Sequence, residues 1–195
     1  MLKRLLIASL LCLPLQAEEA DHAVHEELRG LLKDIRASVN SADYDKMVPC
    51  LSEKLRLTTS LQEFVGSNKG VPDYLRGHFG PDKFVKEVKM EWEPEVLTEL
   101  SPDKTWGLCY GKGSEDFHLK DGRSYHFLTR WTAVVAKEAD GKWRIRSMHM
   151  GSNFLDNPLL TEVAGKAKTY SMYSGIGGAL VGLFLGYTMG KRRKS

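Results

Sequence analysis

The chain has 195 residues, 42% hydrophobic and 27% charged, with a formal net charge of +3. The basic excess lies in the two ends, because residues 18–169 hold 22 basic and 25 acidic residues. This distribution argues against a nucleic-acid-binding surface and indicates basic segments used in membrane targeting. The central part, without repeats or low-complexity linkers, has the length of one domain able to bury a core.

Residues 1–17 have the pattern of a signal peptide. Lys3 and Arg4 precede an apolar run, and Ala17 stands just before two glutamates. We therefore expect cleavage after Ala17 and export of the following domain. The alternatives are an uncleaved anchor and a lipoprotein attached through Cys12, for which the preceding leucine is bulky.

Helices are expected in the first third of the domain. Apolar residues recur at helical spacing over residues 20–39, which predicts an amphipathic helix. A second short helix is expected at 44–51 and a third at 71–79, before a Gly-Pro pair. Between them, residues 55–61 suggest a short strand and residues 64–70 a loop.

Strands are expected from residue 84 onward. Alternating or β-prone runs cover residues 84–92, 105–110, 125–136 and 143–150. Asp-Gly pairs at 121–122 and 140–141 are typical of hairpin turns. Helices followed by an antiparallel meander predict an α+β domain with helices packed on one curved sheet.

Four short motifs in the second half of the domain suggest a family. They are Leu119-x-Asp121-Gly122, Thr129-Arg130-Trp131-Thr132, Asp140-Gly141-Lys142-Trp143-Arg144-Ile145 and His149-Met150-Gly151-Ser152. Their order resembles the nuclear transport factor 2 superfamily, especially its SnoaL-like and ketosteroid-isomerase-like members. The last three also resemble the association domain of calcium/calmodulin-dependent protein kinase. The resemblance implies a cone-shaped domain over residues 18–157, whose pocket is closed by the first helices.

The residues that the isomerase branch uses for catalysis are not present at the matching positions of this chain. That branch uses a tyrosine on the first helix and an aspartate after the second, and the matching positions hold Ile35 and Thr59. Neither residue can move the proton or stabilise the developing oxyanion. We therefore lean against an enzyme, and no motif indicates a metal or a cofactor.

The last two strands supply candidate ligand-binding residues. An arginine beside a histidine suits an anionic or carboxylate ligand, because the guanidinium binds two oxygens. The alternative is an Arg130 paired with a carboxylate such as Glu93 or Asp116. The candidates for binding are Arg130, Trp131, Thr132, His149 and Asn153, and for catalysis His149, His126 and Arg130.

The register of the last hairpin decides which of these residues share a face. A two-residue Asp140-Gly141 turn pairs position 132 with 149, and places Arg130, Thr132 and His149 together. A three-residue loop instead puts Trp131 beside His149. The sequence leaves both registers open. It also leaves open whether Cys50 and Cys109 form a disulfide or stay as free thiols.

The C-terminal segment predicts a membrane anchor. Residues 170–190 carry no charge, and residues 191–195 are basic. A helix of this length spans a bilayer, and basic residues favour the cytoplasmic side. Asn157 can cap a helix with Pro158 at its first position, so we expect a helical linker over 158–169. A cleaved sorting tail and a buried core helix are the alternatives.

Small residues recur every four positions along the expected anchor. A strip of this kind lets helices approach closely, so we expect self-association through Ser174, Gly178, Gly182, Gly186 and Gly190. The leading hypothesis is an exported, membrane-anchored module of a bacterial cell, with its domain periplasmic or extracellular and its C-terminus cytoplasmic. It binds a small ligand or assembles with its own copies. A SnoaL-like enzyme acting on a hydrophobic or carboxylate-bearing molecule, and a structural membrane-assembly subunit, are the alternatives.

Overall fold

A computed structural model describes residues 13–192. The chain divides into two compact units, Met1–Asn153 and Phe154–Ser195, and each is considered by itself. Most of the expected signal peptide and the last three residues of the expected basic tail lie outside the described residues.

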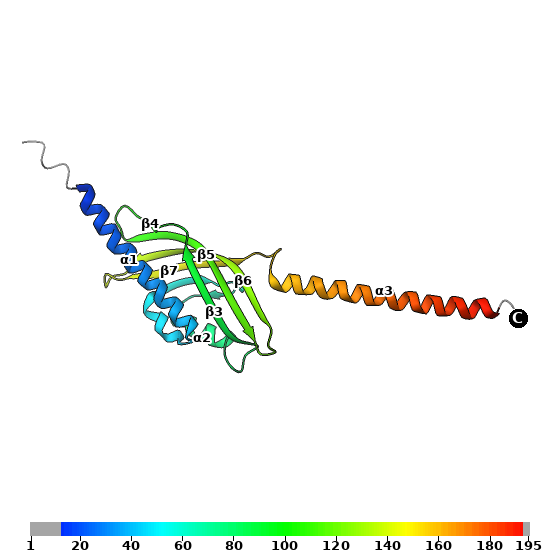
Figure 1. The fold of residues 1–195 in the computed structure, drawn as a ribbon. Helices are drawn as coiled ribbons and strands as arrows, with labels where there is room; N and C mark the ends of the chain where they lie inside the picture. Colours follow the sequence, from blue (N-terminus) through cyan, green and yellow to red (C-terminus); the bar gives the residue numbers. More distant parts are fainter. Residues whose placement is uncertain (1–12, 193–195) are drawn as a thin grey trace, which may run out of the picture. The chain divides into compact units, whose positions relative to one another are not determined.

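Three helices lie in the first half of the first unit, with two strands between the second and the third. The helices are α1 (Leu13–Asn40), the 3₁₀-helix η1 (Tyr44–Cys50) and α2 (Gly70–His78). The predicted apolar stripe is confirmed, because Leu28, Ile35 and Val39 are all buried. The short second helix is 3₁₀, with Pro49 inside it. Figure 1 shows α1 lying across one face of the sheet.

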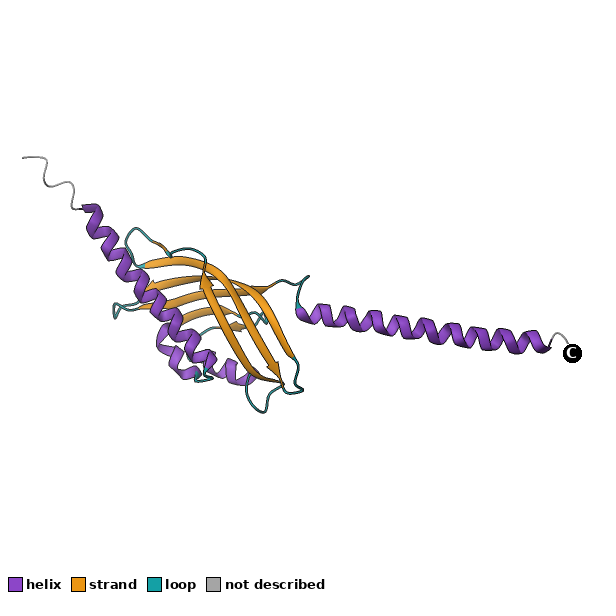
Figure 2. Cartoon of the chain, viewed as in Figure 1, coloured by secondary structure: helices purple, strands orange, loops and turns teal. Residues whose placement is uncertain are grey.

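One seven-stranded sheet forms the rest of the first unit (Figure 2). Its order is β2-β1-β7-β6-β5-β3, and β4 also pairs with β5. The pairing of β1 with β7 is parallel, so the sheet is mixed rather than wholly antiparallel as expected. The strands are β1 (Leu51–Thr58), β2 (Phe64–Val65), β3 (Val85–Pro94), β4 (Glu99–Leu100), β5 (Trp106–Leu119), β6 (Ser124–Lys137) and β7 (Trp143–Ser152).

Strand β5 is longer than the sequence pattern indicates, because two inward positions are glycines. A Cβ added at Gly111 would lie 2.5 Å from Cζ2 of Trp131, and one at Gly113 would lie 2.6 Å from Cδ1 of Trp92. Real Cβ atoms do not approach so closely, so the glycines make room for the two indole rings. The ring centroids lie 6.4 Å apart in the core.

The last hairpin combines features of both expected registers. The loop has three residues, with Gly141 at φ +79°, and Glu138 N–H donates to the Lys142 carbonyl at 2.9 Å. A bulge then places Val134 opposite Ser147 and Val135 opposite Ile145. The bulge shifts the register by one residue, and Thr132 therefore lies opposite His149.

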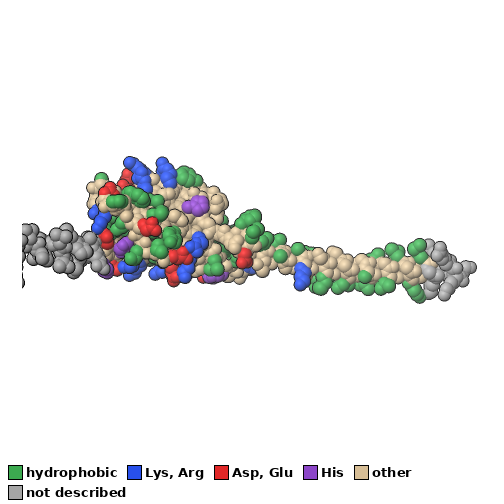
Figure 3. All heavy atoms as spheres, turned by 90° about the horizontal axis from the view of Figure 1, so that it is seen from above, with side chains coloured by type: hydrophobic (Ala, Val, Ile, Leu, Met, Phe, Trp, Pro, Cys, Tyr) green, Lys and Arg blue, Asp and Glu red, His purple; other side chains and the backbone are tan. Residues whose placement is uncertain are grey.

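The second unit is dominated by α3 (Pro158–Arg192). As expected, Asn157 caps it, because Asn157 Oδ1 accepts a hydrogen bond from Leu160 N–H at 3.0 Å. Most apolar side chains along α3 are exposed, and Figure 3 shows them on the helix surface. Among the described residues, however, neither α3 nor another helix combines the length and the apolar character required of a membrane span. The predicted anchor is therefore not confirmed.

Candidate functional site

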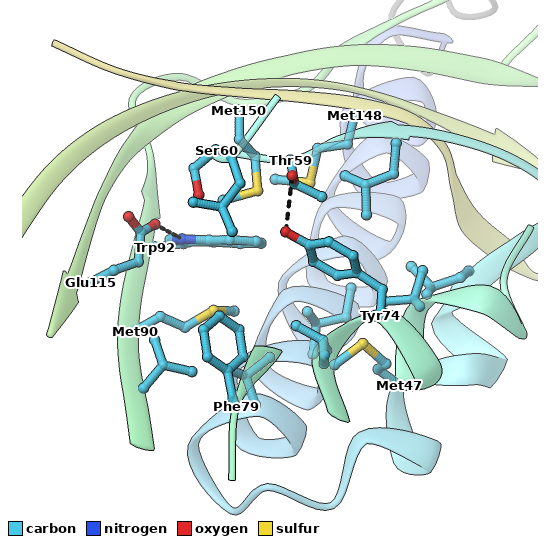
Figure 4. A pocket seen from close by; sticks show the side chains of 18 of the residues that line it. Met47, Thr59, Ser60, Tyr74, Phe79, Met90, Trp92, Glu115, Met148 and Met150 are labelled. Carbon is cyan, nitrogen blue, oxygen red and sulfur yellow. Dashed lines mark hydrogen bonds between the residues drawn. The ribbon is translucent and has the colours of Figure 1, made fainter. Parts of the chain in front are cut away.

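A cavity lies inside the first unit, between the helices and the inner face of the sheet. The space open to the centre of a water-sized sphere measures about 110 Å³. Its walls come from α1, η1, β1, α2, β3, β5 and β7, and are almost entirely apolar. Figure 4 shows Met47, Met90, Met148 and Met150 around it together with Trp92. Such a surface favours an apolar guest, because its few polar groups bind water poorly.

Tyr74 provides one polar group of the cavity wall. It comes from α2, and its hydroxyl donates a hydrogen bond to Thr59 Oγ1 at 3.0 Å (Figure 4). The ring of His78 lies 4.5 Å away, centroid to centroid. Burial raises the pKa of Tyr74, while the Thr59 bond opposes the shift. Tyr74 therefore presents a neutral phenol whose oxygen can still accept a hydrogen bond.

Glu115 is the second polar group, in the wall beside Trp92. Its side chain points inward from β5 and is only 4% exposed. Glu115 Oε1 accepts hydrogen bonds from Trp92 Nε1 at 2.9 Å and from Thr129 Oγ1 at 2.8 Å. Glu115 Oε2 is buried without a partner. Burial raises the pKa of this carboxyl, although the two hydrogen bonds oppose the shift.

The sequence analysis missed both of these groups. Tyr74 lies in a helix whose aromatic residues look like ordinary core residues. Glu115 follows Gly113 by two residues, so strict alternation along β5 is the signal that places it inward. The sequence analysis considered Glu93 and Asp116 instead. Glu93 lies on β3, and Asp116 directly follows Glu115 on β5, so its side chain points to the opposite face of the sheet.

The sequence-predicted binding residues come together, but on the outer face of the sheet. Arg130, Thr132 and His149 are exposed there, whereas the Trp131 side chain is buried on the inner face. All of them, with Asn153, border one shallow outer groove. Arg130 forms an ion pair with Glu95, not with the two carboxylates suggested from sequence.

The other candidates lie apart from the cavity. His126 Nδ1 is 2.7 Å from Asp116 Oδ1, and both side chains are largely exposed. Cys50 and Cys109 are free thiols rather than a disulfide. Over residues 13–192, no group of three or more His, Cys, Asp or Glu side chains has the arrangement of a metal site. The predicted strip on α3 makes no tertiary contact at Gly178, Gly182 or Gly186.

The two positions that match the tyrosine and the aspartate of the isomerase branch line the cavity. Ile35 and Thr59 are among its wall residues, and both are buried. Ile35 offers no proton, and the Thr59 hydroxyl accepts hydrogen bonds from Tyr74 and from the Glu63 N–H at 3.3 Å. The cavity thus has polar groups, but on different elements from those of the isomerase pattern.

Comparisons of the sequence with protein-family models and with curated proteins give no match. The fold, however, is shared with many solved structures. A putative scytalone dehydratase from Novosphingobium aromaticivorans matches with a TM-score of 0.60 and 8% identity, over 70% of this chain and 89% of that one. A hexachlorocyclohexane dehydrochlorinase from Novosphingobium barchaimii matches with a TM-score of 0.59 and 12% identity, over 71% and 93%.

A third similar structure is a putative calcium/calmodulin-dependent protein kinase II association domain from Xanthomonas campestris. It has a TM-score of 0.51 and 20% identity, over 66% of this chain and 86% of that one. Identities this low establish the fold alone. The first unit therefore shares the α+β fold of these structures, with helices on a curved mixed sheet.

Proposed function

We propose that the first unit binds a small, mainly apolar molecule in the cavity beneath α1 and α2. The observation that carries this proposal is an apolar interior cavity whose few polar groups include Tyr74 and Glu115. Pockets of this composition take apolar ligands and use few polar groups to orient them. Four methionines in the wall let the cavity adapt to the shape of its guest.

Mass spectrometry of molecules that co-purify with the intact protein tests this proposal. We expect a small apolar compound with the wild type and its loss in Leu75→Trp, which fills the cavity from α2. The matched control is Leu128→Trp, on the outer face and 70% exposed. Equal ligand content in both variants, with both folded by circular dichroism, would contradict the proposal.

Catalysis of the SnoaL-like kind is the second candidate. The structural neighbours include proteins named as a dehydratase, a dehydrochlorinase and an isomerase-like protein. Eliminations and isomerisations need a proton acceptor beside the substrate, and Glu115 is the carboxyl in the cavity wall. Glu115→Gln should then abolish turnover of a true substrate and leave its binding intact. Unchanged turnover would remove that role.

Membrane attachment through α3 is a separate proposal about the second unit. The exposed apolar side chains of α3, such as Leu183 and Phe184, are 72% and 67% exposed. A helix with apolar residues around its whole circumference is stable only when its surface is covered. We propose that lipid covers it and that the first unit is exported. The full chain should then float with liposomes, and deletion of residues 158–195 should abolish flotation; equal flotation of both forms would oppose this role.

Self-assembly through α3 is the remaining part of the sequence-based hypothesis. Gly182→Leu with Gly186→Leu should reduce oligomers of the full chain in detergent, because bulky side chains keep helices apart. Leu180→Ala with Leu183→Ala is the matched control outside the strip. An unchanged oligomer distribution in the glycine variant would contradict the role.

A further inference from the structure

A second cavity lies beside the first, under the stretch of α1 from Leu28 to Leu32. Its space for a water-sized sphere is about 80 Å³. Leu28, Leu31 and Leu32 form its helix side, and Trp131 and Ala133 belong to its sheet side. Its surface is also mostly apolar. The first unit is thus hollow on both sides of one layer of side chains.

That layer consists of Trp92, Ile145 and Met148, which line both cavities. Trp92 is fixed by its hydrogen bond to Glu115. Ile145 is β-branched and therefore has restricted rotamers. Met148 is unbranched and rotates about three bonds, so it is the member of the layer that can move aside. In Figure 4 its side chain reaches from β7 toward Tyr74.

The charges around the two cavities differ. His25 and Arg29 border the second cavity, and the Arg29 side chain is 52% exposed. Arg29 also pairs with Glu26, but a guanidinium has five N–H donors and can bind a second carboxylate. The first cavity has no cationic wall residue, and its buried carboxyl, Glu115, disfavours an anion.

From the shared layer and this difference in charge, we infer that both cavities together hold one elongated apolar chain that ends in an anion. The anionic end lies at Arg29 and His25. The chain passes Met148, and its far end lies near Tyr74 and Thr59. The inference names the ligand class of the proposed binding cavity and rests on that proposed function. A saturated fatty acid has this chemistry.

A chain-length series tests the inference with the full-length protein. Octanoate, dodecanoate and hexadecanoate are titrated below their micelle concentrations and followed by calorimetry. We expect affinity to rise by up to about fourfold for each added methylene that is buried. In Met148→Ile, affinity should stop rising beyond the shorter chains, because the β-branched side chain closes the passage between the two cavities. Leu128→Ile, on the outer face of the sheet and outside both cavities, is the matched control.

Ala133→Leu gives a second block, since Ala133 lines only the second cavity. It should weaken the binding of octanoate and of hexadecanoate, because a chain anchored at Arg29 enters the second cavity first. Affinity that stops rising after octanoate in the wild type would overturn the inference and leave the single-cavity function standing. Failure of every chain to bind would overturn the inference alone, and the co-purification experiment then tests the single-cavity function separately.

The anionic end is tested by comparing dodecanoate with dodecanol. Arg29→Gln should reduce the preference for dodecanoate by about tenfold, as expected for a lost charge-assisted hydrogen bond. Arg36→Gln, on the same helix but paired with Glu91 at 2.7 Å, should leave the preference unchanged. Equal preference in the wild type and Arg29→Gln would overturn the proposed orientation.

Discussion

The two faces of the sheet differ in where their polar groups lie and in what those groups can do. On the outer face, Arg130, His149 and His126 are exposed, and water weakens the ion pair of Arg130 with Glu95. In the cavity between the inner face and the helices, Glu115 of β5 and Tyr74 of α2 are the titratable wall residues, and burial raises the pKa of each. Reactive-looking residue types are therefore poor guides unless the face they occupy is known.

Among the variants that compare the two faces, a substitution at a glycine of β5 should reduce the free energy of unfolding most. Gly111→Ala places a Cβ 2.1 Å from the Glu93 carbonyl oxygen and 2.5 Å from the Trp131 ring. We expect a loss of about 3 kcal/mol in the free energy of unfolding, measured by urea denaturation. Gly151→Ala has no heavy atom within 4 Å of the new Cβ and should change stability little. Equal losses would contradict the packing described for the inner face.

Replacing the buried carboxyl should have the next largest effect. Glu115→Leu leaves the Trp92 N–H and the Thr129 hydroxyl without their acceptor, at a cost of about 2 kcal/mol. Asp116→Leu, one residue along the strand, removes only an exposed contact with His126 and should cost less than about 1 kcal/mol. Thermal unfolding of both variants compares the two faces directly. A larger loss for Asp116→Leu would reverse the comparison.

The pH dependence of stability should reveal the raised pKa of Glu115. The folded protein keeps this proton to a higher pH than the unfolded chain does. The free energy of unfolding therefore falls as pH rises from about 4.5, the ordinary carboxyl value, through the raised pKa. Glu115→Gln should remove this fall. Parallel pH profiles for the wild type and the variant would show that Glu115 is ionised normally.

Removing the Tyr74 hydroxyl should have a smaller effect. Tyr74→Phe deletes the hydrogen bond to Thr59 and should cost about 1 kcal/mol of unfolding free energy. Tyr110→Phe is the outer-face control, because Tyr110 borders the exposed groove. Its stability should match the wild type. Chemical denaturation measures both variants, and equal losses would mean that the inner hydroxyl has no special role.

The smallest effects are expected on the outer face. Arg130→Ala removes an ion pair with Glu95 in which the arginine side chain is 67% exposed. Such pairs contribute less than about 1 kcal/mol. Neither Arg130→Ala nor His149→Ala should change ligand affinity, measured by calorimetry. Loss of binding in either variant would move the site to the outer groove, where the binding residues suggested by the sequence lie.

Much of the fold was predictable because local patterns determine it. The helical stripe around Ile35, the Asp-Gly turns and the cap at Asn157 are short-range signals. The parallel pairing of β1 with β7 was not predictable, because it joins segments far apart in the chain. The full length of β5 was hidden because Gly111 and Gly113 interrupt its alternation.

The site was less predictable than the fold. The neighbours of Arg130 within residues 128–135 are apolar or small on both faces, so alternation alone does not show that Arg130 points outward. The bulge between Val134 and Val135 also changes the register, and nothing local marks it. Tyr74 and Glu115 gain their importance only from tertiary burial.

Methionine methyl NMR with carbon-13 labels tests the central claim, ligand binding in the inner cavity, most directly. Met47, Met90, Met148 and Met150 line that cavity, whereas Met172 and Met189 lie exposed on α3. On titration with dodecanoate, we expect the four cavity methyl signals to shift in a saturable manner and the two α3 signals to stay in place. Saturable binding without any shift of the cavity methyl signals would contradict the account.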